Sequence, residues 1–249
     1  MNTKRISLVS VLFMAAQLLS ARVVVASDSL DLMLGATTNY VFRGISQTDN
    51  KAAGYAGFDY SHSSGPYFGL WTSRVNFPTV DGRADAELDI YGGIAGEIRS
   101  LGNLGWDLGY ILYRYNQTPP RYDEAYLSLS FDLVPRRLKA TIKGSYETEG
   151  DQVVGEGLVT LDAGSGLFVK LQPGHVDDRS TDNNDYKYVK VAASKSVDVN
   201  SAGIRTIDIE LAYSDTSLKR GDASPYGVIN DRNEDRVHDL WYLSVTAHF

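Results

Sequence analysis

The last stretch of the chain, residues 237–249, constrains the fold most, because its side chains alternate between apolar and polar. One face is apolar but for Asp239 near its start, and it holds Val237, Asp239, Trp241, Leu243, Val245, Ala247 and Phe249. The other face is mostly polar. Successive side chains of a β-strand point to opposite sides, so the pattern predicts one strand between two different environments. The apolar face meets either a protein core or lipid.

The same period of two recurs through most of the chain, which is rich in tyrosine and glycine. After residue 26 there is no run of about 18 apolar residues, which excludes a helical membrane protein. We predict about twelve strands, at residues 30–43, 54–62, 67–75, 84–97, 104–115, 124–133, 138–147, 152–161, 166–172, 186–196, 204–214 and 237–249. Glycines in 152–161 leave open which of its side chains face outward.

Two features favour lipid rather than protein outside this sheet. Glu87 and Asp89 fall on the inner face of one strand, where two carboxylates are costly in a dry core and tolerable in a wet lumen. The connections at 62–66, 97–103, 134–137, 162–165 and 196–203 are short. Those at 44–52, 76–83, 116–121, 148–151, 173–184 and 215–236 are, with one exception, longer or rich in proline and charge. This asymmetry and the even strand count predict an all-β fold, a closed antiparallel transmembrane β-barrel of about twelve strands.

Residues 1–26 predict a cleaved secretory signal, which leaves residues 27–249 as the barrel domain. Lys4 and Arg5 precede an apolar run, and small residues near its end offer a cleavage site. A membrane anchor is the alternative, but the run is short for a span and Arg22 shortens it further. Without Lys4, Arg5 and Arg22, 21 of the 24 basic residues remain against 31 acidic ones. Because this net charge is negative, we expect no nucleic-acid partner.

Several segments carry more specific residues than strand alternation requires. They are NYVFRGISQTDN at 39–50, GFDY at 57–60, ELDIYGG at 87–93 and the closing strand that ends in Phe249. In these segments the chain resembles the TorF family, and the resemblance covers most of residues 27–249. It implies an outer-membrane barrel with no catalytic motif and no confirmed cargo.

The resemblance also implies a role for the closing strand as the signal that barrel assembly machinery recognises. The residues of this expected signal are Trp241, Leu243, Val245, Ala247 and Phe249. The long charged segments 173–184 and 215–236 look particular to this chain.

The inward positions of the expected strands supply the candidate pore-lining residues. They are Arg43, Trp71, Glu87, Asp89, Lys139, Lys143, Lys170, Lys190, Asp208 and Glu210. The lysines cluster on three strands and most of the carboxylates lie elsewhere, so a transverse field would orient dipolar or zwitterionic solutes in a narrow channel. The alternative is a salt-bridged, plugged interior, because a barrel of this size lies between the filled and the open-channel limits.

Aromatic and basic residues near the strand ends have two interpretations each. Arg43 either lines the pore mouth and binds an anionic solute, or it pairs with an inner carboxylate or extends to the rim. Trp71 either stacks on a sugar ring or fills a narrow lumen. Interfacial girdles are expected at Tyr40, Phe42, Tyr60, Phe131, Tyr146, Tyr213, Trp241 and Phe249.

The leading functional hypothesis is a porin-like channel in the outer membrane of a Gram-negative bacterium, for passive diffusion of small hydrophilic solutes. Besides these solutes, the expected partners of the protein are outer-membrane lipid and the barrel assembly machinery. A non-conducting barrel that binds partners through residues 215–236 is the main alternative, and an outer-membrane lipid hydrolase is a third. The four histidines show no spacing for zinc or for a catalytic triad, so no metal, cofactor or enzymatic activity is predicted.

Overall fold

The computed structural model describes residues 27–79, 82–116, 122–148, 151–179, 185–219, 222–224, 227–228 and 234–249. The predicted secretory signal at residues 1–26 lies outside the described residues. None of the helices in these ranges is long and apolar enough to cross a membrane.

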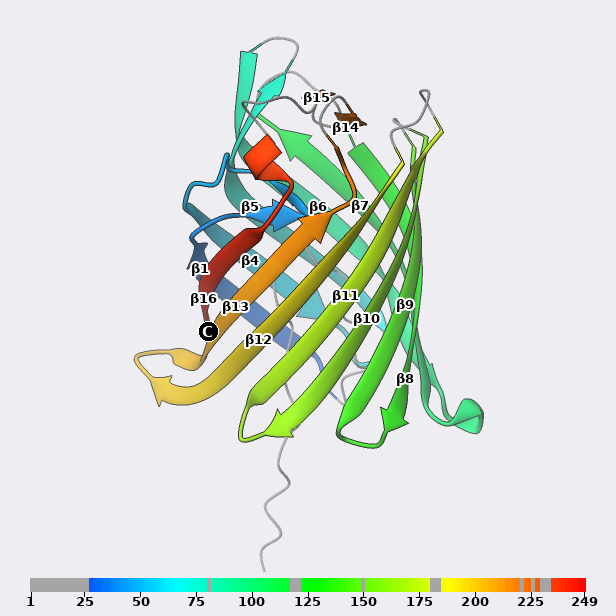
Figure 1. Ribbon diagram of the computed structural model, residues 1–249. Coiled ribbons are helices and arrows are strands. Elements are labelled where there is room, and N and C mark those ends of the chain that lie inside the picture. The colour runs from blue at the N-terminus through cyan, green and yellow to red at the C-terminus, as the bar shows by residue number, and fades with distance from the viewer. Residues whose placement is uncertain are drawn as a thin grey trace, which may run out of the picture.

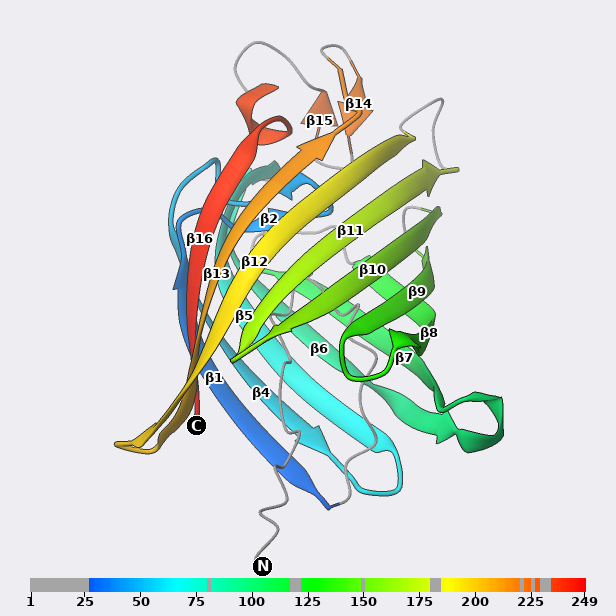
Figure 2. The same ribbon diagram turned by 60° about the horizontal axis from the view of Figure 1, so that its bottom comes forward.

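Twelve strands of the described ranges join into one closed antiparallel barrel, which Figures 1 and 2 show from two directions. They are β1 (Ser29–Thr37), β4 (Ala53–Ser61), β5 (Pro66–Thr79), β6 (Gly82–Ile98), β7 (Leu104–Tyr115), β8 (Tyr122–Val134), β9 (Leu138–Glu147), β10 (Gln152–Gly164), β11 (Leu167–Asp178), β12 (Tyr186–Ser201), β13 (Ile204–Thr216) and β16 (Leu240–His248). Strand β1 closes the ring by pairing with both β4 and β16. The predicted fold class and strand count are therefore confirmed.

Four short strands and two helical turns lie outside the ring in the described ranges. They are β2 (Val41–Phe42), β3 (Ile45–Ser46), β14 (Ala223–Ser224), β15 (Gly227–Val228), η1 (Arg99–Leu101) and η2 (Glu234–Arg236). Tight turns join the strands at the end of the barrel where the C-terminus lies, and β14 and β15 lie at the opposite end (Figure 1). We call these the short-turn end and the long-loop end.

The outer wall of the barrel is apolar. More than half of the surface of Leu30, Leu34, Leu108, Ile142 and Trp241 is exposed. The alternate positions point inward, where polar and charged residues such as Ser128, Ser194 and Thr246 are buried. Contiguous exposed apolar surface is unfavourable in water, so the period of two gives the barrel an outer face suited to lipid and a polar interior.

The closing strand shows this division along its whole length. Trp241, Leu243 and Val245 are exposed, whereas Tyr242 and Ser244 are buried. The predicted outward position of Val237 is wrong, because Val237 is fully buried and precedes β16. Asp239 has a left-handed backbone (φ 52°), which interrupts the extended chain between that valine and the strand.

Several strand boundaries differ from the predicted ones, and three of the larger differences change which residues lie in the wall. Residues 76–79 continue β5, and residues 173–178 continue β11, where connections are expected from the prolines. Both extensions have strand partners, since Pro78 pairs with Arg83 and Pro173 with Val189. The third difference is that β1 ends at Thr37, and the chain that follows does not remain in the wall.

Candidate functional site

Residues 38–52, which we call the inner hairpin, fold into the barrel instead of forming an external connection (Figure 2). Within it β2 pairs with β3, and the backbone amide of Gln47 donates to the Tyr40 carbonyl at 2.7 Å. Tyr40 is 3% exposed and Phe42 is largely covered. The expectations of a strand through residue 43 and of girdle positions at Tyr40 and Phe42 are wrong, because this alternation belongs to a hairpin inside the lumen.

The tip of the inner hairpin is a two-residue turn formed by Arg43 and Gly44. Both have positive φ, 47° and 82°, as a type I′ hairpin turn requires. Gly44 lies against the wall at β12 and β13, and a Cβ atom there would be 2.8 Å from the Tyr188 Cβ and would overlap the Thr216 side chain. Glycine therefore lets the tip sit against one wall while the side chain of Arg43 reaches across to other strands.

Arg43 joins two inner carboxylates and a lysine in a buried group, which we call the paired-charge layer. Its Nη2 atom is 2.7 Å from Glu124 Oε2 on β8 and 3.9 Å from Glu156 Oε2 on β10. Lys143 on β9 is 3.3 Å from Glu124 and 3.9 Å from Glu156. Ser145 accepts a further hydrogen bond from Arg43 at 3.4 Å. Two cations and two carboxylates thus form a neutral group that connects the inner hairpin to three strands.

The surroundings of the paired-charge layer hold its charges in place. All four side chains are at most 8% exposed. The ammonium group of Lys143 lies 4.5 Å from the ring centre of Tyr126. Glu156 also accepts hydrogen bonds from Tyr188 and, at 3.4 Å, from Gln172. Loss of one partner from such a group leaves a buried charge without compensation, which is costly.

A second group of paired charges lies on the strands next to this layer. Lys170 and Lys190 reach Glu210 at 3.1 and 2.7 Å. His248 lies 3.1 Å from Asp208 through Nε2, and Ser196 hydrogen-bonds Asp208 as well. Lys170, Lys190 and Glu210, on β11, β12 and β13, are therefore ion-paired on one side of the barrel rather than separated into opposing walls.

The opposite half of the lumen, along β1 and β4 to β7, is filled by aromatic side chains. The indole of Trp71 is 1% exposed and lies between Tyr40 of the inner hairpin and Tyr55 of β4, with ring centres 5.3 and 6.2 Å away. A contiguous cluster of buried residues surrounds this stack and includes Tyr67 and Tyr91. This packing corresponds to the lumen-filling alternative for Trp71.

The carboxylates of the aromatic half bind tyrosine hydroxyls. Tyr115 donates to Glu87 at 3.1 Å. In the same way Tyr91 donates to Asp59 at 2.9 Å and Tyr67 to Asp107 at 2.5 Å. Asp89 is 1% exposed, and its β5 partner in the strand ladder is Trp71. Of the predicted inner acids, Glu87 and Asp89 therefore lie in a different environment from Asp208 and Glu210.

Two cavities lie at different levels along β9. Near the short-turn end, Lys139 lines a cavity of about 370 Å³ together with Thr160 and Phe168. Four residues further along the strand, Lys143 belongs to the paired-charge layer, and after four more residues Glu147 lines a cavity of about 30 Å³ beside Arg43. The residues of the paired-charge layer on β9 thus lie between those that line the two cavities.

Two members of the layer, Glu124 and Glu156, are absent from the predicted site. Glu156 was obscured because Gly155 and Gly157 flank it, and only pairing with β9 and β11 fixes it as inward. Glu124 lies at the start of a strand whose other inward positions include Tyr126, Ser128, Ser130 and Asp132. Its inward parity is visible in the sequence, but its partner Arg43 comes from a segment whose place in the lumen is not.

The described features define a class: a twelve-stranded membrane-type barrel with an apolar outer wall and an interior narrowed by a charged hairpin. The chain belongs to the Gcw_chp family, which is described as "Bacterial protein of unknown function" and matches residues 27–249. No curated protein matches the sequence.

The fold is similar to several solved outer-membrane barrels. The KdgM porin is 8% identical with a TM-score of 0.57, and the match covers 88% of this chain and 97% of that one. The NanC porin is 15% identical with a TM-score of 0.53, over 88% and 98% of the two chains. An outer membrane channel from Pseudomonas putida F1 is 9% identical with a TM-score of 0.54, over 92% and 97%. At these identities the likeness shows a common fold.

Proposed function

We propose that the protein is an outer-membrane channel for passive diffusion of small hydrophilic solutes, and that the inner hairpin sets its narrowest level. The observation that carries this proposal is the bridge from the hairpin tip to the wall, in which Arg43 pairs with Glu124 and Glu156. A hairpin held inside a polar lumen by ion pairs leaves a hydrated route beside it and restricts the size and charge of solutes.

Two properties of the barrel support a hydrophilic route rather than a route for lipids. The outer wall is apolar, and polar and charged side chains gather on the inner wall at β8 to β13. The likeness to porins adds support at the level of the fold. The same features support our proposal that the barrel lies in the outer membrane, surrounded by membrane lipid. The segments at 39–50, 57–60 and 87–93 support TorF as a finer family assignment.

The strongest competing proposal is a barrel that does not conduct. The observation in its favour is the extent of filling, since the aromatic cluster occupies one half of the lumen and the paired-charge layer crosses the other. We propose no enzymatic activity. Both ring nitrogens of His248 lie beside carboxylates, Nδ1 at 2.9 Å from Asp31 and Nε2 at 3.1 Å from Asp208, so neither is directed at a serine nucleophile.

The outward residues of β16 support recognition by barrel assembly machinery as a further part of the proposal. Trp241, Leu243, Val245 and Phe249 are exposed on the lipid-facing side of the last strand. Strand β16 closes the barrel by pairing with β1, which lies at the other end of the chain. Before this pairing forms, the apolar row on β16 is accessible to the assembly machinery.

Reconstitution of the purified full chain into planar bilayers tests the channel proposal. We expect discrete conductance steps in salt solution, and slower passage of larger neutral sugars than of smaller ones in liposome swelling. Folded protein without steps at any applied voltage, and without swelling, contradicts the channel and leaves the non-conducting barrel.

A further inference from the structure

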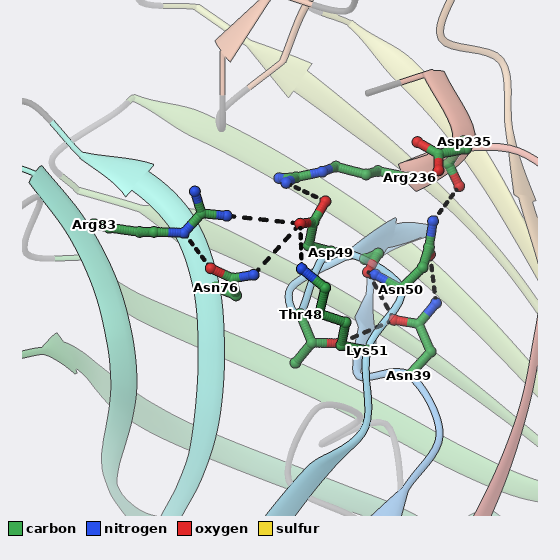
Figure 3. A network of polar contacts seen from close by, with 10 residues as sticks. Asn39, Thr48, Asp49, Asn50, Lys51, Asn76, Arg83, Asp235 and Arg236 are labelled. Carbon is green, nitrogen blue, oxygen red and sulfur yellow. Dashed lines mark hydrogen bonds and ion pairs between the residues drawn. The ribbon is translucent and has the colours of Figure 1, made fainter. Parts of the chain in front are cut away.

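The inner hairpin has a second attachment, at the long-loop end, where several groups converge on the carboxylate of Asp49 (Figure 3). Lys51 Nζ lies 3.1 Å and Arg83 Nη2 lies 3.7 Å from Asp49 Oδ2. The Arg236 guanidinium donates to the other oxygen, Oδ1. Asn76 donates its side-chain amide at 3.4 Å. One carboxylate therefore serves three cations.

The three cations reach this point from separate parts of the chain. Lys51 belongs to the inner hairpin, Arg83 to β6, and Arg236 to η2 ahead of β16 (Figure 3). Their convergence is a property of the folded barrel, because nothing in their spacing along the sequence brings them together. Asp49 contributes one negative charge against three positive ones, so the group attracts a further anion.

The backbone around Asp49 is held in a conformation that aims the carboxylate into this group. Asp49 and Asn50 both have left-handed φ values, 60° and 56°. The backbone amide of Asn50 donates to the Ser46 hydroxyl at 2.9 Å, and the side-chain amide of Asn50 donates to the backbone carbonyl of Asp235 at 2.9 Å. The Asn39 side chain donates to Asn50 at 2.8 Å. Left-handed residues cost free energy unless their surroundings fix them, and these contacts do so.

The cation group is accessible and has donor capacity that Asp49 does not use. The side chains of Arg83 and Lys51 are 52% and 63% exposed, whereas that of Arg236 is 17% exposed. The Nε atom of Arg236 is buried and has no hydrogen-bond acceptor among the described residues. A guanidinium binds carboxylate or phosphate through two parallel hydrogen bonds, and Asp49 engages Nη2 alone.

We propose that Lys51, Arg83 and Arg236 form a binding site for a small oxyanion, a carboxylate or a phosphate, which Asp49 occupies as a tethered competitor. An incoming anion displaces the Asp49 carboxylate and frees the outer attachment of the inner hairpin. The consequence for transport rests on the proposed channel function, whereas the anion site itself does not depend on conduction.

The ionisation of Asp49 agrees with this role. Partial burial raises the pKa of its carboxyl, but the hydrogen bonds from Lys51 and Arg236 outweigh burial and hold the pKa below its ordinary value. Asp49 is therefore an anion at neutral pH, as a competitor for this site must be.

Trp71 supplies a spectroscopic reporter, because Tyr40 of the inner hairpin contacts its indole at 5.3 Å. The chain has three tryptophans, so replacing Trp106 and Trp241 by phenylalanine leaves Trp71 alone. In this background, inorganic phosphate is titrated into the full chain in detergent. We expect a saturable emission change, with an apparent Kd at least about tenfold lower in Asp49→Asn than with Asp49 present, because a tethered competitor acts at millimolar or higher effective concentration.

Three variants complete the test. Arg236→Gln should remove phosphate binding both with Asp49 and in Asp49→Asn. Asp177→Asn removes a carboxylate that pairs with Arg179 at 3.2 Å, and it should leave the phosphate Kd unchanged. Equal affinities with and without Asp49, or an Arg236→Gln variant that still binds, overturn the proposal.

A second arm separates a dissolved anion from the phosphates of a lipid headgroup. Micelles that contain lipid A replace free phosphate in the titration. A response to free phosphate supports the solute site, and a response to lipid A alone overturns it. If the folded protein gives no conductance steps, the channel proposal fails, but the phosphate titration still decides the anion site.

Discussion

The two halves of the lumen use the same inward strand positions for different purposes. Along β4 to β7 these positions carry aromatic rings packed around Trp71, with tyrosine hydroxyls on the carboxylates. Along β8 to β13 they carry lysines and glutamates in ion pairs. The inner hairpin joins both, since Tyr40 stacks in the aromatic half and Arg43 enters the charged half. Both halves therefore hold the inner hairpin, the aromatic half by packing and the charged half by ion pairs, and the proposed channel would run beside the charged contacts.

The largest effect on stability is expected from the aromatic half. Trp71→Ala removes a fully buried indole and leaves a cavity, which costs about 3–5 kcal/mol of unfolding free energy. Urea unfolding in detergent or lipid measures it. Trp71→Phe is the matched control, because it keeps an aromatic ring in the stack with Tyr40 and Tyr55 and should change the midpoint far less. Equal shifts for the two variants contradict a packed aromatic half.

A smaller loss is expected from the charged half. Lys143→Gln removes one of the two cations of the paired-charge layer, while Arg43 still pairs with Glu124. The poorly compensated carboxylates should cost about 1–3 kcal/mol of unfolding free energy, which the same urea experiment measures. Arg205→Gln, at a half-exposed ion pair with Asp31, is the control and should lie within about 1 kcal/mol of the parent. If Lys143→Gln leaves the unfolding free energy unchanged, the paired-charge layer is hydrated and the prediction fails.

Lys139 tests whether the cavity near the short-turn end belongs to the conducting route. Lys139→Glu reverses a charge at the 370 Å³ cavity without breaking the paired-charge layer. We expect the reversal potential in a salt gradient to shift toward cations, by a modest amount because salt screens charges near open water. An unchanged reversal potential places Lys139 outside the ion path.

The smallest effect is expected from acid on the outer attachment of the inner hairpin. The folded-state pKa of Asp49 is lowered, so its stabilising contribution is complete above the ordinary aspartate pKa and is lost as pH falls through the folded value, below about pH 4. The test uses the protein in which Trp71 is the lone tryptophan. As the pH falls, the emission of Trp71 should change when Asp49 is present and should change less in Asp49→Asn. Identical pH profiles contradict a link from Asp49 to the aromatic half.

Alternation in the sequence predicts the barrel wall well because the two faces of each strand meet different environments. Except on β10, where the sequence leaves the parity open, the outward apolar residues from β4 to β16, such as Leu108 and Ile142, have the parity that the sequence predicts. The same rule fails at residues 38–43, where the alternation continues although the chain has left the wall. Both faces of that hairpin are inside the barrel, and no local pattern distinguishes lipid from a packed lumen.

The site is less predictable than the wall because its partners come from different strands. The inward parity of Lys143, Lys170 and Lys190 follows from their neighbours in sequence. Their pairing with Glu124 or Glu210 depends on the register and on how far each side chain reaches across the lumen. The adjacent Arg43 and Gly44 are the one local hint of a tight turn, since a glycine tolerates the left-handed φ that such a turn needs.

The single-channel conductance of Arg43→Gln tests the central claim most directly. Arg43→Gln removes the charge that ties the hairpin tip to Glu124 and Glu156, and slower migration after boiling than before it verifies that the variant barrel is folded. The account predicts larger or more frequent conductance steps than in the wild type, with Arg205→Gln unchanged. A folded Arg43→Gln barrel with the conductance and ion preference of the wild type would contradict it.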